Sequence, residues 1–134
     1  METSTQEYAI RKTVNLPFEE ADARVREALS AEGFGVLTEI DVKETLKKKL
    51  DVEFRPYRIL GACNPPLAHR ALSAEADIGL LLPCNVIVYE SDEAGSSVVA
   101  AIDPVVQLGA TGKSELEEVA REVKERLERV LAAL

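Results

Sequence analysis

The fold of this chain turns on residues 59–90, which read ILGACNPPLAHRALSAEADIGLLLPCNVIVYE. This stretch contains both cysteines, Cys63 and Cys84, and the only histidine, His69. A Pro-Pro pair at positions 65 and 66 stands between two strongly apolar runs. Rare polar and sulfur-containing side chains are therefore gathered in one segment of a largely aliphatic protein, and we expect a functional site to lie there.

The same stretch predicts two strands joined by a helix. The run Tyr57–Cys63 forms the first strand, and Gly61 inside it indicates a bulge or a close approach by another group. Asn64 can cap a helix that begins at the two prolines. We expect the chain to become extended again from Ile78 and to form a strand at Cys84–Tyr89. Antiparallel pairing would place the end of the first strand beside the start of the second.

The rest of the chain has alternating strand and helix patterns. Gly33 stands where a helix needs a left-handed C-terminal cap, and Ser114 with Glu117 forms a capping-box pattern before the last helix. We expect the segment Pro104–Gly109 to be extended. The predicted elements are a strand at Tyr8–Val14, a helix from Pro17 to Gly33, a strand at Phe34–Ile40, a short helix capped by Asp41, a strand at Val98–Ile102 and a helix from about Ser114 to the end.

This order of elements predicts the α+β class, with one domain spanning residues 1–134. We expect an antiparallel sheet of about five strands with the helices packed on one face. The polar loop at residues 91–96 contains Gly95 and is typical of a hairpin between the last two strands. A chain of 134 residues fits one domain, and folding at that size buries roughly two thirds of the chain's surface.

The aliphatic run Val98–Ile102 has no charged residue and is apolar on both of its alternating faces. At the edge of a sheet such a strand would be unprotected, and one of its faces needs a cover beyond the protein's own helices. We therefore expect a homodimer in which a symmetric partner covers that face. The alternative is that the segment Pro104–Gly109 folds back over it.

The formal net charge of the chain is −8, and no Lys or Arg occurs between Ala71 and Asp103. We expect no nucleic-acid partner, because phosphate contacts need clustered basic side chains. The lysines at 47–49 are interpreted as the solvated face of a helix. The first residues lack the apolar core of a signal peptide, and no apolar run is long enough for a membrane span. We expect a cytoplasmic protein with reduced thiols and no membrane partner.

Cys63 ends a predicted strand immediately before a helix, where backbone N–H groups and the helix dipole favour a thiolate. This position makes Cys63 a candidate catalytic thiol. Cys84 would then be its resolving partner in a thiol-based redox or sulfur-transfer enzyme. The chain has no Cys-x-x-Cys pattern, and the alternative is that both cysteines are buried apolar residues.

A second hypothesis is a non-catalytic domain that binds a small ligand or a metal. The candidate ligand-binding residues are Cys63, Asn64, His69, Cys84 and Asn85, whose amides donate and accept hydrogen bonds and whose thiols are soft metal ligands. Cys63, His69 and Cys84 would make a three-residue transition-metal set, although their spacing matches no strong zinc pattern. The sequence itself requires no cofactor. A third hypothesis gives the two Cys-Asn dipeptides a purely structural role at chain reversals.

The segments YRILGACNPPLAHRAL and LLPCNVIVYE, with Asp103-Pro104 after the fifth strand, resemble the domain-of-unknown-function 302 family. The resemblance covers nearly the whole chain, including GFGVLTEIDV at residues 33–42, and the two Cys-Asn dipeptides make it specific. It implies a compact α+β domain of the TATA-binding-protein-like type, with a curved antiparallel sheet backed by helices, that forms a homodimer. It implies no activity, because the family is uncharacterised.

Overall fold

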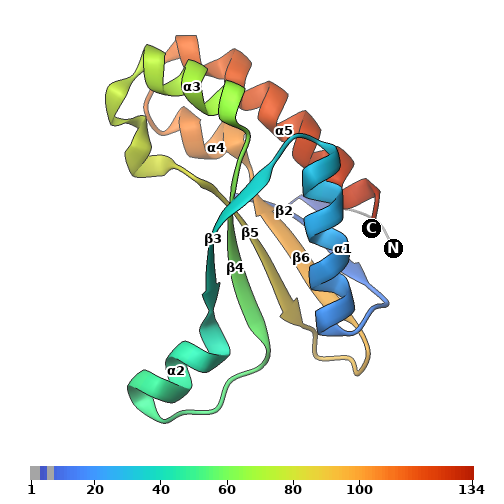
Figure 1. Ribbon diagram of the computed structural model, residues 1–134. Coiled ribbons are helices and arrows are strands. Elements are labelled where there is room, and N and C mark those ends of the chain that lie inside the picture. The colour runs from blue at the N-terminus through green and yellow to red at the C-terminus, as the bar shows by residue number, and fades with distance from the viewer. Residues whose placement is uncertain (1–3, 6–7) are drawn as a thin grey trace.

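An antiparallel sheet with helices on one face forms the structure, a computed structural model that describes residues 4–5 and 8–134 (Figure 1). The strands are β1 (Ser4–Thr5), β2 (Ala9–Val14), β3 (Gly35–Asp41), β4 (Tyr57–Cys63), β5 (Cys84–Glu90) and β6 (Ser97–Ile102). The α-helices are α1 (Phe18–Ala31), α2 (Val42–Leu50), α3 (Pro65–Ala74), α4 (Pro104–Gly109) and α5 (Glu117–Ala132). Two 3-10 turns, η1 (Ala76–Leu81) and η2 (Ser114–Leu116), precede β5 and α5. The predicted α+β class is confirmed.

The hairpin strand β6 lies at the centre of the sheet, whose order is β1-β2-β6-β5-β4-β3. Each neighbouring pair is antiparallel. The prediction that the aliphatic run of β6 forms an unprotected edge strand is wrong. The N-terminal strand β2 pairs along the length of β6, from Ala9 opposite Ile102 to Val14 opposite Ser97. The edges are β1 and β3.

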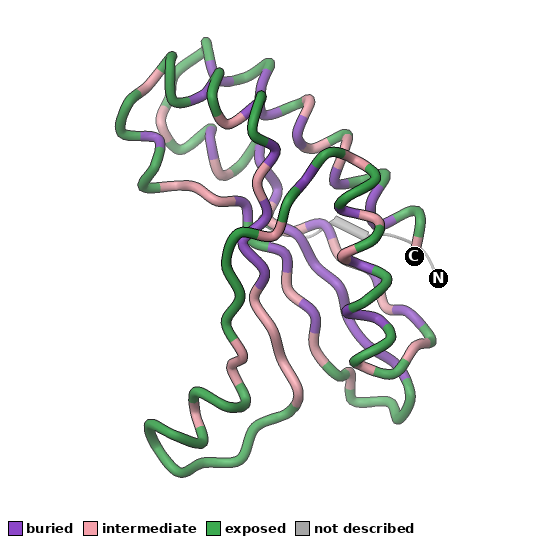
Figure 2. The backbone as a smooth tube through the Cα atoms, in the orientation of Figure 1, coloured by how far each residue is buried: buried purple, intermediate pink, exposed green. Residues whose placement is uncertain are grey.

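The helices α1 and α5 lie over one face of the sheet, and the hydrophobic core lies between these helices and the sheet (Figures 1 and 2). The sheet side chains Ile10, Leu60 and Val86 are at most 1% exposed. They share one apolar cluster with Val25 of α1 and Leu127 of α5. Among residues 4–5 and 8–134, no helix combines the length and apolarity that crossing a membrane requires.

Two of the helix boundaries follow from local signals that the sequence carries. Gly33 has φ +84°, and α1 ends with hydrogen bonds from Gly33 N–H to Ser30 and from Phe34 N–H to Leu29, which form a Schellman cap. The Asp41 side chain accepts from the N–H of Glu44 at the start of α2. These two predictions are confirmed. The predicted capping box of the last helix is wrong, because α5 begins three residues later without a side-chain cap.

Two segments expected to be extended are helical. The chain from Ile78 lies in η1 instead of extending towards β5. Pro104–Gly109 forms α4, because the Asp103 side chain accepts from the N–H of Val105 at 2.9 Å and a proline occupies the first helical position. An Asp-Pro pair that ends a strand thus also starts a helix. Since α4 packs beside α5, it does not fold back over the opposite face of the sheet.

The close approach expected at Gly61 is present. A Cβ atom at this position would lie 2.8 Å from Cγ of Pro83 and would also collide with the Thr38 hydroxyl. The register of β3 against β4 shifts between Val36 and Thr38, which makes Leu37 the extra residue of a bulge. Glycine at position 61 therefore lets the chain entering β5 pack tightly against β4.

We expect Gly61→Ala to lower the free energy of unfolding by about 1–3 kcal/mol, because Pro83 and Thr38 must move away from the new methyl group. Gly35→Ala on the neighbouring strand is the matched control, since a Cβ there meets no atom within 4 Å. Urea denaturation of both variants and the wild-type chain measures the difference. Equal stability of the two variants would contradict the proposed close packing.

Candidate functional site

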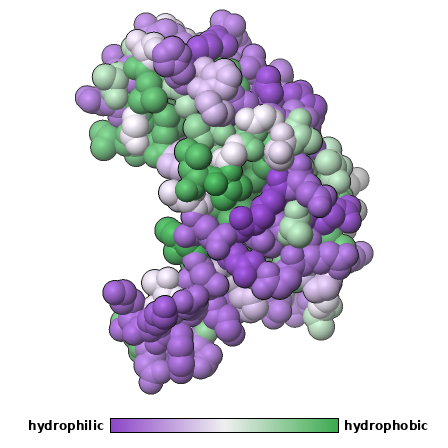
Figure 3. Space-filling view, in the orientation of Figure 1, coloured by the Kyte–Doolittle hydropathy of each residue, from purple (hydrophilic) through white to green (hydrophobic). Residues whose placement is uncertain are grey.

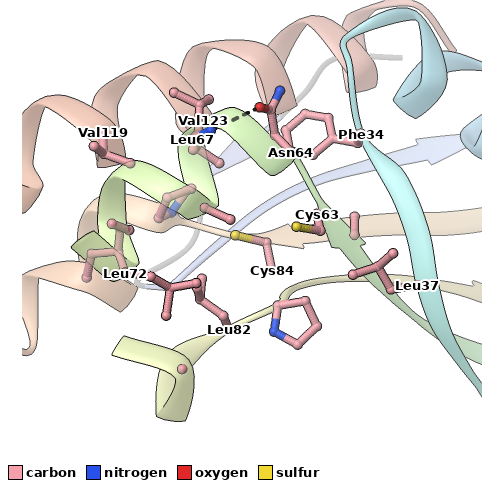
Figure 4. Close-up of a pocket in the computed structure, with 17 residues that line it drawn as sticks. Phe34, Leu37, Cys63, Asn64, Leu67, Leu72, Leu82, Cys84, Val119 and Val123 are labelled. Carbon is pink, nitrogen blue, oxygen red and sulfur yellow. Dashed lines mark hydrogen bonds between the residues drawn. The ribbon is translucent and has the colours of Figure 1, made fainter. Parts of the chain in front are cut away.

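A cavity of about 270 Å³ opens where the sheet ends and α3 begins (Figure 4). Leu37 and Leu72 are exposed members of its wall, with 67% and 43% of their surface open to solvent. None of the side chains that line the cavity is charged. They are Phe34, Leu37, Ala62, Cys63, Asn64, Leu67, Ala68, Ala71, Leu72, Gly79, Leu82, Pro83, Cys84, Pro104, Leu108, Val119 and Val123.

The structure places Cys63 and Cys84 in the wall of the same cavity, an arrangement that the predicted antiparallel pairing allowed but did not decide. Ala62 lies opposite Cys84 in the β4–β5 ladder, so Cys63 is one residue beyond that pair. Both thiols are free, and Figure 4 shows both sulfur atoms directed into the cavity. Burial, and secondarily the neighbouring Cys63, raise the pKa of the Cys84 thiol to about 11. Cys84 is therefore a protonated, neutral thiol at physiological pH.

Gln107 of α4 is the polar partner of Cys84, and it is not among the site residues predicted from the sequence. The Cys84 thiol donates a hydrogen bond to Oε1 of Gln107 over 3.5 Å, while Nε2 of Gln107 donates to the carbonyl of Leu81. The sequence signal that was available is the Asp103-Pro104 helix start, which places Gln107 one turn into α4. Gln107 links three segments that enclose the cavity.

Asn64 lies in the wall of the cavity, yet its amide is used to build the fold. Its Oδ1 accepts from the N–H of Leu67 at 3.3 Å, and its Nδ2 donates to the carbonyl of Glu32 at 3.5 Å. Pro65 and Pro66 have no N–H. Positions 65, 66 and 67 therefore offer Cys63 no N–H group, because the first two are prolines and the N–H of Leu67 is bonded to Asn64. The expectation was that N–H groups at this helix start favour a thiolate at Cys63.

The other two predicted site residues lie elsewhere. His69 is exposed on α3, and Asn85 is exposed on β5 opposite Gly61; neither belongs to the cavity wall. In the described ranges, 4–5 and 8–134, no group of three or more His, Cys, Asp or Glu side chains is placed to hold a metal ion. The three-residue metal set of Cys63, His69 and Cys84 is therefore not assembled.

These features define an α+β domain with an antiparallel sheet and, at one end, an apolar cavity that contains two free thiols. The chain belongs to the family described as "Domain of unknown function DUF302", which matches residues 10–134. The family resemblance found in the sequence is thereby confirmed. No curated protein matches the chain.

A solved structure from this family is similar to the chain over almost its full length. It is the crystal structure of an uncharacterized conserved DUF302 protein from Bacillus stearothermophilus, with 32% sequence identity and a TM-score of 0.87. The similarity covers 96% of this chain and 98% of that one. It supports the same fold and carries no statement about activity.

The environment of Cys84 predicts slow alkylation. In a Cys63→Ser variant at pH 8, we expect Cys84 to react with iodoacetamide about a hundredfold more slowly than an ordinary thiol, because few molecules carry the thiolate. The rate should climb as the pH rises above 8, because burial, the main cause of the raised pKa of Cys84, remains in this variant. Intact-mass spectrometry follows the reaction, and the same variant unfolded in urea is the control. Equal rates in the folded and unfolded chains would show that Cys84 is not protected.

Removing the side-chain amides of Asn64 and Asn85 should change the free energy of unfolding by different amounts. Asn64→Ala should lower the free energy of unfolding by about 1–2 kcal/mol, because α3 loses its cap. The matched change Asn85→Ala, at an exposed position of β5, should cost less than about 0.5 kcal/mol. Chemical denaturation measures both. Similar losses in the two variants would argue against the capping role of Asn64.

Proposed function

We propose that this protein is a non-catalytic domain that binds a small, uncharged, apolar molecule in the cavity beside Cys63 and Cys84. The observation that carries the proposal is the composition of the cavity wall, which is aliphatic and aromatic apart from two thiols and one amide. A charged ligand would lose its hydration there without gaining an ionic partner. An apolar ligand would instead gain from leaving water.

The size of the cavity limits the ligand. An apolar cavity of about 150 Å³ holds benzene, so 270 Å³ suits a fused bicyclic ring or a short hydrocarbon chain. A bound molecule of this kind would also cover Leu37 and Leu72, which are otherwise open to water. Each Å² of apolar surface that the ligand removes from water favours binding by about 25 cal/mol of free energy.

The surroundings of the thiols support binding over catalysis. A resolving thiol must also attack as a thiolate, whereas the pKa of Cys84, the candidate resolving thiol, is raised to about 11. His69, the only histidine, lies outside the cavity wall. The metal-binding version has less support, because within residues 4–5 and 8–134 no group of three or more His, Cys, Asp or Glu side chains is placed to hold a metal ion. We further propose a cytoplasmic location, supported by the two free cysteines.

A thiol-based redox function is the second candidate, because both thiols line the same cavity. In that function the two thiols would each lose a hydrogen atom and form a disulfide, while an oxidant such as glutathione disulfide is reduced to two thiols. Intact-mass spectrometry in a glutathione redox buffer separates the candidates. Formation of the intramolecular disulfide at cytosolic glutathione potentials would favour the redox function over simple binding.

Two fluorescent probes that differ by one charge test the binding proposal. N-phenyl-1-naphthylamine is uncharged, and 8-anilinonaphthalene-1-sulfonate adds a sulfonate to nearly the same rings. We expect the uncharged probe to bind at least about tenfold more tightly, since the sulfonate must be desolvated without a partner. Fluorescence titration of the full chain gives both dissociation constants. Tighter binding of the sulfonate would contradict the proposed ligand class.

Replacing either of two alanines on α3 with phenylalanine tests where the probe binds. Ala68→Phe fills the cavity and should weaken binding of the uncharged probe about tenfold or more. Ala74→Phe adds the same ring to an exposed position of the same helix and should leave the affinity unchanged. Circular dichroism checks that both variants fold. Equal affinities would mean that the probe binds elsewhere, and the cavity would lose its assigned role.

A further inference from the structure

The two edges of the sheet differ in length. The described part of β1 has 2 residues, whereas β3 at the opposite edge has 7. A very short edge strand gives another strand little to pair with. The outer edge of β3 presents main-chain N–H and C=O groups along roughly 23 Å, since an extended chain rises about 3.3 Å per residue. In the part of the chain that the structure describes, no segment pairs with this edge.

The devices that commonly protect an edge strand are weak along β3. The strand contains no proline or lysine, and Leu37 and Ile40 are 67% and 49% exposed. Its two acids act within the chain, because Glu39 forms an ion pair with α1 and Asp41 caps α2. The bulge at Leu37 interrupts the ladder, but residues 38–41 pair regularly with β4 beyond it. The outer edge of β3 is therefore open to a further strand.

The cavity opens at one end of this edge. Leu37 belongs to both features, since it lies in β3 and also lines the cavity. Figure 3 shows the molecule hollowed on this side, between the part that holds α3 and η1 and the projecting helix α2, and hydrophobic side chains gather in the hollow. A strand paired with β3 would lie about 4.8 Å from it. Such a strand would therefore pass the mouth of the cavity.

These two features select the chemistry of the partner. A row of main-chain donors and acceptors at strand spacing is complementary to another extended backbone. Successive side chains of that backbone point to opposite sides, so one of them can turn into the cavity. The cavity wall carries no charge, so this side chain must be apolar. A cavity of about 150 Å³ holds benzene, and 270 Å³ therefore has room for a phenylalanine ring.

We infer that β3 and the cavity together bind an extended peptide segment of another protein. The segment adds a strand to the sheet at β3 and inserts one large apolar side chain into the cavity. Main-chain hydrogen bonds supply affinity, and the cavity selects the side chain. The inference rests on the apolar cavity of the proposed function and names a partner for that same site. The added strand also covers Leu37 and Ile40, which are open to water in the single chain.

Fluorescence anisotropy of the full chain with labelled synthetic peptides tests this inference. The parent peptide alternates threonine and valine around one central phenylalanine. Replacing that phenylalanine with alanine should weaken binding about tenfold or more, because the cavity stays empty.

Two further peptides keep every side chain of the parent and carry N-methyl groups on alternate residues, one set on the odd positions and the other on the even positions. A strand pairs with β3 through one of its edges, so one N-methylated peptide should bind about tenfold or more weakly and the other should match the parent. Equal affinities of the two N-methylated peptides would overturn the inference.

A substitution at the junction of β3 and the cavity tests the same contact from the side of the protein. Leu37→Asp places a charge beside the inserted side chain and should weaken the parent peptide about tenfold or more. Val106→Asp is the control, since Val106 is exposed on α4 outside the cavity wall, and it should leave the affinity unchanged. Circular dichroism checks that both variants fold. Equal affinities of the two variants would contradict the inference.

Hydrogen exchange read by mass spectrometry locates the bound peptide. The amides of residues 35–41 should exchange more slowly when the parent peptide is present, because the added strand occupies their outer edge. Unchanged exchange in this segment would overturn the inference. Protection that grows with protein concentration in the absence of peptide would assign the edge to a second copy of the chain, and would overturn it as well.

The uncharged probe N-phenyl-1-naphthylamine separates this inference from the proposed function. We expect the parent peptide to displace the probe, because both occupy the cavity. A chain that binds the probe but no peptide at concentrations up to about 1 mM would leave the proposed function standing and the inference wrong. A chain that binds neither would contradict both.

Discussion

The tight pairing of β4 with β5 is the constraint on which the rest of the structure depends. Gly61 lets Pro83 pack directly on β4, and the ladder then runs from Tyr57 opposite Tyr89 to Ala62 opposite Cys84. The chain between the two cysteines must leave the sheet at the end of β4 and return to it at the adjacent start of β5. It does so as α3 and η1, and the cavity is the space that remains under this connection.

The same constraint decides the chemistry of the two thiols. Each cysteine lies at a strand end, and the connection above them supplies leucine and alanine side chains rather than charges. In such surroundings a thiol behaves as a small apolar group with a weak donor, and Cys84 directs that donor to Gln107. The side-chain amide of Asn64 caps α3 and donates a hydrogen bond to the carbonyl of Glu32 at the end of α1.

The two faces of the sheet meet different requirements. One face is buried by α1 and α5, whose apolar stripes follow the helical period. The other face is also apolar, but the helices of the chain lie on the first side or, as α2, beyond the end of the sheet. The cavity under α3 lies at the end of the sheet and is separate from the centre of this second face.

The sequence by itself determined the α+β class, the strands and helices apart from η1 and α4, the Gly33, Asp41 and Asn64 caps and the close approach at Gly61. These features depend on contacts within a few residues or on side-chain periodicity, which a sequence displays directly. Only the tertiary structure decided that β6 lies at the centre of the sheet, that Gln107 reaches Cys84 and that His69 faces solvent. Those outcomes depend on pairings between distant segments, which are selected by burial summed over the whole chain rather than by any local pattern.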